Sequence, residues 1–109
     1  MSDSGLGLER EFTIAADHPA FAGHFPGAPV LPGVVLLSLV MQVLAEAPEL
    51  SAGLGAAPQI DQVKFLHPVG PGQTLRVSLA AQGHGVGFAI HLGLRIVVTG
   101  RLSGTVPGL

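Results

Sequence analysis

Hydrophobic and polar residues alternate near the start of the chain. Leu6, Leu8, Phe12 and Ile14 are separated by other, mostly polar residues, and Arg10 interrupts the apolar row once. Alternation with a period of two is typical of a strand that buries one face. We therefore expect a half-buried strand in this segment.

An almost wholly apolar segment, residues 34–46, has the spacing of a helix. Its polar residues are four positions apart and would form one narrow stripe on a helix: Ser38, Gln42 and Glu46. Pro32 suits the first helical position, where its missing N–H does no harm, and Pro48 is expected to end the helix. A helix that is apolar on every other face is covered by protein on most sides.

The second half of the chain shows the alternation of strands. The pattern predicts strands over 60–69, 75–81, 86–98 and 102–106, with turns at Pro71-Gly72, Gly83-His84-Gly85 and Thr99-Gly100. Segments 17–33 and 48–58 are rich in proline, glycine or alanine and are expected to be loops. We expect one α+β domain over residues 1–109, in which a single helix is wrapped by a strongly curved antiparallel sheet of about five strands.

Within the first of these later strands, the two faces differ in chemistry. Val63 and Phe65 fall on one face, and Gln62 and Lys64 on the other.

Composition narrows the function classes. The chain has 109 residues, of which 48% are hydrophobic and only 11% are charged, whereas charged residues make up about 25% of a typical domain. So few charges favour an oligomer, in which a second subunit covers apolar surface. The net charge of −2 does not show the excess of basic residues that is typical of nucleic-acid-binding proteins. The chain has no cysteine, and its histidines lack the spacing of metal ligands, so we expect no metal and no cofactor.

Neither the apolar segment nor the start of the chain suggests a membrane protein. Residues 34–45 are too few to span a bilayer, which needs about 20 residues, and the start of the chain is unlike a signal peptide. We expect a cytoplasmic protein that neither enters a membrane nor binds nucleic acid.

The most informative segment precedes the helix. Residues 23–33 read Gly-His-Phe-Pro-Gly-Ala-Pro-Val-Leu-Pro-Gly. Three prolines stiffen this loop, so His24 is held close to a helix N-terminus, which carries partial positive charge. An imidazole has a reference pKa of about 6.5 and can act as a neutral base at cellular pH. No carboxylate lies between His24 and Glu46.

This motif, continued by Val34 and Gln42, resembles the signature of the hot-dog-fold 3-hydroxyacyl-[acyl-carrier-protein] dehydratases of fatty acid synthesis. The later segments Val63-Lys64-Phe65, Pro68-Val69 and Pro71-Gly72 with Leu75 resemble the second conserved stretch of that family. The resemblance covers roughly residues 8–106 in the right order. It implies a hot-dog fold and an acyl thioester substrate, carried by acyl carrier protein or by coenzyme A.

The resemblance also implies roles for particular residues. The catalytic histidine of the family falls on His24, and the backbone N–H that holds the thioester carbonyl falls on Gly33. The backbone carbonyl that orients the histidine falls on Val30. Phe25 and Gln42 fall at substrate-binding positions.

One position departs from the family pattern. The family's second catalytic group, a Glu or Asp on the helix, falls on Ser38, and a serine hydroxyl is a far weaker acid. Glu46 is no simple substitute, because eight residues along a helix is about 12 Å. Asp17, at the start of the loop, has no position fixed by the sequence. Ser38 fits an ordinary helix serine that bonds its own backbone equally well, Gln42 fits a structural role, and a loop histidine can itself be structural.

Two classes of function follow. The first is a hydro-lyase, a dehydratase that acts on 3-hydroxyacyl thioesters with His24 as the base. The second is a binding subunit with weak or no activity, including a hetero-oligomer in which a related subunit supplies the missing carboxylate. In such dehydratases the histidine and the acid meet across a dimer interface. Thioester hydrolysis is a third option that would also need a carboxylate.

Overall fold

The computed structural model describes residues 7–19, 30–55 and 58–104 of the chain. These residues contain five strands and two helices, which confirms the α+β prediction. In chain order the elements are β1 (Gly7–Thr13), α1 (Gly33–Ala45), α2 (Pro48–Ser51), β2 (Gln59–Phe65), β3 (Thr74–Gln82), β4 (Gly85–Leu92) and β5 (Arg95–Ser103).

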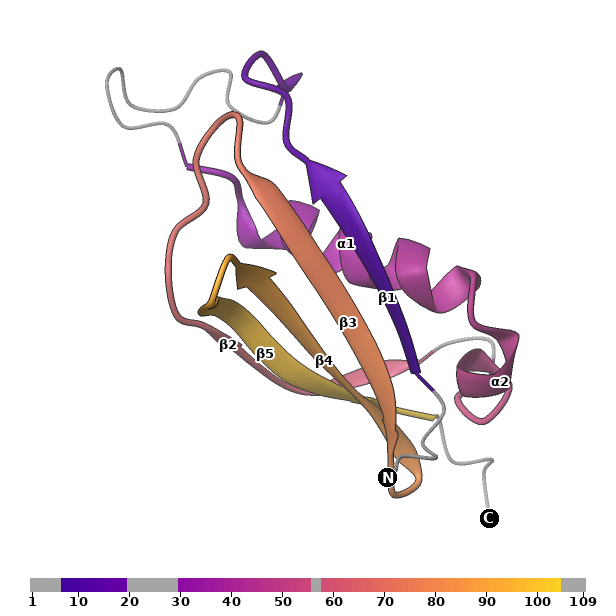
Figure 1. Ribbon diagram of the computed structural model, residues 1–109. Helices are drawn as coiled ribbons and strands as arrows, with labels where there is room; N and C mark the ends of the chain where they lie inside the picture. Colours follow the sequence, from indigo (N-terminus) through magenta and orange to yellow (C-terminus); the bar gives the residue numbers. More distant parts are fainter. Residues whose placement is uncertain (1–6, 20–29, 56–57, 105–109) are drawn as a thin grey trace.

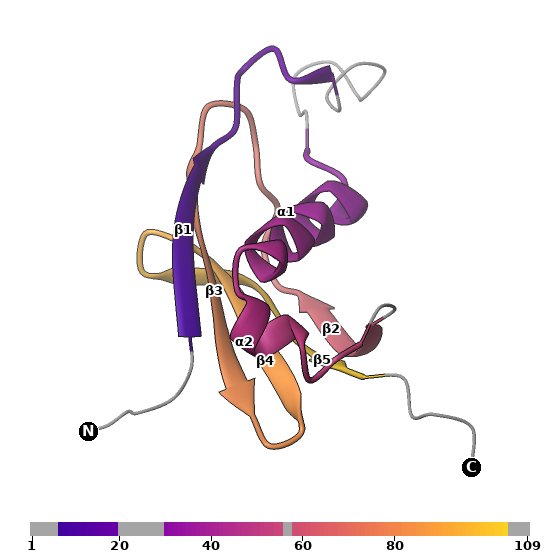
Figure 2. The same ribbon diagram turned by 90° about the vertical axis from the view of Figure 1, so that its right-hand side faces the viewer.

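The five strands form one antiparallel sheet in the order β1-β3-β4-β5-β2. The sheet curves around α1, which lies across it and packs mainly on β3 and β1 (Figures 1 and 2). This is a hot-dog fold, as the sequence predicts. Its two edge strands are β1 and β2.

The core lies between α1 and the concave face of the sheet. Leu75, Val77 and Leu79 alternate along β3 and are buried, as are Val40 and Val43 of α1. Burying one such aliphatic side chain contributes about 1.5–3 kcal/mol. The alternating apolar side chains of the strands and the apolar side chains of the helix thus form one core.

Arg10 interrupts the apolar row of β1 because it reaches beyond the core. It lies on the same face of β1 as Leu8 and Phe12, and its Nε donates to Glu46 Oε1 at 2.8 Å, at the end of α1. Both side chains are about half exposed, at 46% and 50%. Such a pair contributes less than about 1 kcal/mol, so it orients the helix end more than it stabilises the fold.

The prediction for the last third of the chain is wrong in its boundaries. Residues 86–98 do not form one strand, since the chain turns at Gly93, whose φ is +62°. Thr99-Gly100 is no turn but lies in the middle of β5. The expected strand over 102–106 begins inside β5, which ends at Ser103.

A β-bulge explains this error. The pairing of β4 with β5 shifts by one residue between Ile90 and His91, which face Val98 and Ile96. A bulge inserts one extra residue into a strand, so the alternation of apolar residues continues across the hairpin without a visible break. Pattern counting therefore cannot locate the turn there.

Two smaller expectations also change. The segment 48–58, expected to be a loop, begins with the short helix α2, because Pro48 occupies a first helical turn instead of only ending α1. The strand expected over 60–69 ends at Phe65.

One side of α1 stays uncovered by its own chain. Val34 is 72% exposed, and Ser38, Met41, Gln42 and Ala45 are exposed with it on one stripe of the helix. The expectation of a helix covered on most sides is therefore met only on the faces toward β1, β3 and the core. Within the described ranges, no helix is long and apolar enough to cross a bilayer.

Candidate functional site

The N-terminus of α1 is the first component of the site. Pro32 is its N-cap residue, no side chain caps it, and its first turn contains no acidic residue. The N–H groups of Val35 and Leu36 donate to the Pro32 carbonyl oxygen at 3.0 and 3.4 Å, whereas those of Gly33 and Val34 have no backbone acceptor among the described residues. Such N–H groups at a helix start together carry about half a positive charge. The helix start is therefore able to hold an oxygen that carries negative charge.

A pocket opens at this helix start. It has a volume of about 430 Å³, and its lining is mostly apolar. The lining residues are Val30, Leu31, Gly33, Leu36, Phe65, Leu66, His67, Pro68 and Val69. Leu31 N–H donates to the Val69 carbonyl oxygen at 2.8 Å, which ties the segment before α1 to the segment after β2. Val30 and Gly33, both expected site residues, thus lie in one pocket.

Phe65 lies directly against Gly33. A Cβ atom built on Gly33 would be 2.8 Å from Cζ of Phe65 and 2.9 Å from its Cε1. Only a glycine leaves room for the ring in this position. Phe65 is also 50% exposed, so the ring forms a movable wall of the pocket.

Ser38 and Gln42 lie away from the lining of this pocket, on the exposed stripe of α1. The Ser38 hydroxyl donates to the Val35 carbonyl oxygen at 2.6 Å, the bond of an ordinary helix serine. His24 and Phe25 lie outside the described residues. The structure therefore brings together two of the expected site residues, places two others on an open face, and leaves the roles of all of them as predictions.

The sequence reasoning missed two pocket residues, Phe65 and His67. Phe65 was expected on the same face of its strand as Val63, and no role in a site was assigned to it. The signal that could have found it is the pairing of a bulky aromatic residue in one motif with a glycine at the helix start in the other.

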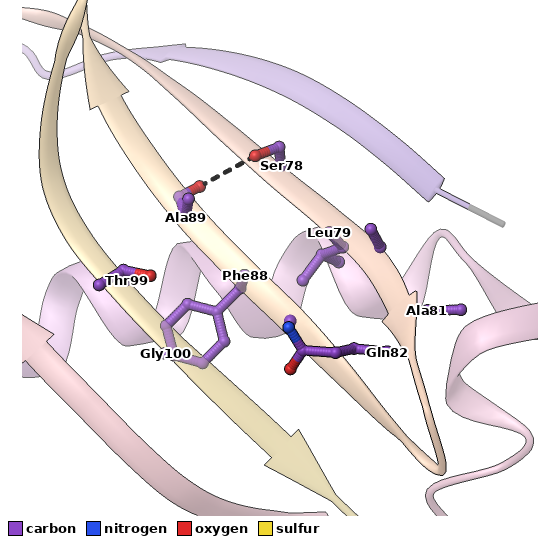
Figure 3. A pocket seen from close by; sticks show the side chains of 10 residues that line it. Ser78, Leu79, Ala81, Gln82, Phe88, Ala89, Thr99 and Gly100 are labelled. Carbon is purple, nitrogen blue, oxygen red and sulfur yellow. Dashed lines mark hydrogen bonds between the residues drawn. The ribbon is translucent and has the colours of Figure 1, made fainter. Parts of the chain in front are cut away.

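A second hollow lies on the face of the sheet away from α1 (Figure 3). It has a volume of about 270 Å³ and is bordered mainly by small side chains of β3, β4 and β5, such as Ser78, Ala89 and Thr99. No titratable side chain lines it. In the part of the chain that the structure describes, no group of histidine and acidic side chains could hold a metal ion.

A model of the ApeI-like family, described as ApeI dehydratase, matches residues 2–101. The chain belongs to the ApeI-like dehydratase family. This confirms the resemblance read from the motif at the start of α1, since the relatives of this chain are dehydratases of hot-dog fold.

Curated relatives of this ApeI-like chain are 3-hydroxyacyl-[acyl-carrier-protein] dehydratases named FabZ. The one from Geobacter metallireducens is 38% identical over 76 residues, which cover 64% of this chain and 51% of the relative. The one from Chloroflexus aggregans is 37% identical over 91 residues, covering 78% of this chain and 63% of the relative. The ApeI-like chain therefore spans about half to two thirds of the length of the curated relatives it matches.

Solved structures agree with the fold. The dehydratase heterocomplex ApeI:P from Xenorhabdus doucetiae matches with a TM-score of 0.74 and 27% identity, over 89% of this chain and 85% of that chain. An uncharacterised protein from Erwinia carotovora subsp. atroseptica matches with a TM-score of 0.70 and 29% identity, over 94% and 86%. The fluoroacetyl-CoA-specific thioesterase FlK, at 19% identity and a TM-score of 0.65, covers 93% of this chain and 91% of that chain; it shows the fold alone.

Proposed function

We propose that this chain binds a 3-hydroxyacyl thioester with its carbonyl oxygen at the N-terminus of α1 and takes part in its dehydration, with His24 as the base. The observation that carries the proposal is the mostly apolar pocket built on the uncapped first turn of α1, at Gly33. An acyl chain suits the apolar lining, and the thioester oxygen suits the free N–H groups. The family model and the FabZ relatives support the same reaction class.

The reaction removes water from C2 and C3 of the acyl chain. A base takes the proton from C2, the electron pair of that bond forms the double bond, and the C3 hydroxyl leaves with a proton from an acid. Negative charge builds on the thioester oxygen as C2 loses its proton. Each hydrogen-bond donor aimed at such an oxygen typically lowers the activation free energy by about 3–4 kcal/mol. The helix start would therefore supply a large part of the catalysis.

The acid is the missing part of this proposal. Ser38 stands where the family pattern has a carboxylate, and its hydroxyl already donates to Val35. Loss of a general acid typically slows a reaction by about 10²- to 10⁴-fold. We therefore propose that the chain alone is a weak dehydratase.

A second candidate function follows from the open face of α1. A related subunit seated on that face would bring its own helix close to Ser38 and could supply the carboxylate to a composite site. The exposed apolar side chains Val34 and Met41 support an interface on this face of α1. The match to a dehydratase heterocomplex supports a partner that is not a copy of the same chain.

Replacing Ser38 with glutamate should raise the dehydratase activity of a homo-oligomer of this chain. Ser38 is exposed in the single chain, but a second copy on the open face of α1 would partly dry the site, and a carboxyl group there can have its pKa raised and then donate a proton, which a serine hydroxyl cannot do. The expected gain is about tenfold or more, measured as hydration of a crotonyl thioester. Ser38→Gln is the matched control, since it has similar size but no acidic proton.

Two results would contradict this account. One is a wild-type chain that alone turns over at a rate typical of enzymes and is slowed by Ser38→Glu. The other is an equal increase in activity in Ser38→Glu and Ser38→Gln, which would show that packing and not an acidic proton causes the increase.

Replacing Gly33 with alanine should impair the pocket while sparing the fold. The added methyl group would displace the Phe65 ring, which is half exposed and free to move, so we expect a stability loss of about 1 kcal/mol. A misplacement of about 1 Å can cost on the order of 10²-fold in rate, so kcat/KM should fall far more than stability. The double variant Gly33→Ala/Phe65→Leu should recover part of the rate. A double variant no better than Gly33→Ala would show that the ring is irrelevant to the site.

A further inference from the structure

The cationic side chains of this molecule fall into two groups. Each of three arginines forms an ion pair with a carboxylate: Arg10 with Glu46, Arg76 with Glu9, and Arg101 with Asp61, at 2.8, 3.4 and 2.7 Å. Lys64 and Arg95 have no such carboxylate among the described residues. Lys64 belongs to β2, whose Phe65 lines the pocket, and Arg95 belongs to β5, which pairs with β2.

Arg95 is linked to the pocket by a histidine. Its Nη1 lies 3.1 Å from Nδ1 of His67, and His67 lines the pocket that also contains Gly33. A guanidinium group can only donate hydrogen bonds, so Nδ1 of His67 is the acceptor and its Nε2 carries the ring hydrogen. The rim of the pocket thus presents a guanidinium and a second N–H donor, and no acidic side chain lines the pocket.

This pair is unlike a structural ion pair. An arginine placed against a histidine gains no neutralising charge, and Arg95 remains exposed at the start of β5. A planar guanidinium suits two oxygens of a phosphate at once, and a charge-assisted hydrogen bond is about twice as strong as a neutral one.

We propose that Arg95 and His67 form a subsite for the phosphate of the pantetheine arm that carries the acyl thioester. This inference rests on the proposed function, because it takes the thioester to be bound at Gly33. Leu66 and Ile96, which are 56% and 44% exposed, provide apolar surface next to the pair for the uncharged part of the arm. The same phosphate occurs in acyl carrier protein and in coenzyme A, so the subsite serves either carrier.

Two ligands that differ only in the phosphate test this subsite. Binding of crotonyl-4′-phosphopantetheine and crotonyl-pantetheine is measured by calorimetry on the wild-type protein, Arg95→Gln and the control Arg76→Gln. Arg76 is a partly exposed arginine of β3 on the convex face of the sheet, so both variants lose one charge. We expect wild-type protein to bind the phosphorylated ligand about tenfold tighter, Arg95→Gln to lose that preference, and Arg76→Gln to keep it.

The outcomes separate the subsite from the function. Equal binding of the two ligands by wild-type protein, or equal loss in Arg95→Gln and Arg76→Gln, overturns the subsite and leaves the proposed function standing. Failure of wild-type protein to bind either ligand overturns the proposed function. Where the subsite holds, tighter binding of crotonyl-acyl-carrier-protein than of crotonyl-CoA assigns the phosphate to a carrier protein, and the reverse assigns it to coenzyme A.

Discussion

His24→Ala should abolish conversion of a 3-hydroxyacyl thioester to its enoyl product while leaving the protein folded. From the motif at residues 23–33 we expect this imidazole to lie beside the helix start where we propose the thioester oxygen binds. Removing a general base typically costs about 10²- to 10⁴-fold in rate. The rate of crotonyl thioester hydration is best measured in the complex with a partner subunit or in the Ser38→Glu background, where the starting activity is higher.

A second histidine provides the control. His84 lies exposed in the turn between β3 and β4, so His84→Ala should retain full activity. Turnover that survives His24→Ala would remove His24 from the mechanism. A large fall in thermal stability of the His24 variant, seen by circular dichroism, would instead assign it a structural role.

Gly100→Ala should destabilise the protein more than most surface changes. Gly100 faces the ring of Phe88, which extends toward it from β4 (Figure 3). A Cβ atom here would overlap Cζ of Phe88 and the Gln62 carbonyl oxygen, and it would lie 2.9 Å from Phe88 Cε2. The carbonyl belongs to the backbone of β2, so only a shift of that strand could relieve the clash. We expect a loss of about 3 kcal/mol and a fall in Tm on the order of 10–20 °C.

Gly87→Ala is the matched control for this prediction. Gly87 lies on β4, and its added Cβ would come no closer than 3.2 Å to the side-chain amide of Gln82, which is exposed and can move. Its free energy of unfolding should change by less than about 1 kcal/mol. Thermal unfolding followed by circular dichroism compares the two. Similar Tm values for both variants would show that the sheet adjusts to a Cβ atom at position 100 at little cost and that stability does not require Gly100.

Local patterns predicted the elements whose neighbours in sequence determine them. The alternation of Leu75, Val77 and Leu79 located β3, and the apolar run with its prolines located α1 to within a residue at each end. The turn at Gly93 was not predicted, because the β-bulge depends on how two strands pair and cannot be seen in a local sequence pattern. The strand count of five was correct although the last two strands were wrongly divided.

The residues of the pocket also differ in how far the sequence could predict them. Gly33 and Val30 were predicted as site residues because one contiguous motif contains both, and both line the same pocket, while their roles stay predictions. Phe65 and His67 come from a segment more than 30 residues later, and their proximity to the helix start depends on the course of the sheet. The Arg95 contact with His67 likewise joins the ends of two strands.

The strand that carries the pocket wall has little holding it in place. β2 is an edge strand that pairs only with β5, and six of its seven residues are exposed. Amide hydrogens of a segment with few buried contacts exchange through local opening, at a free energy well below that of global unfolding. Phe65 and the pocket wall that follows it therefore belong to the part of the sheet that opens first. Amide exchange along β2 should slow when a ligand or a partner occupies this side, while exchange in β3 and β4 stays set by global unfolding.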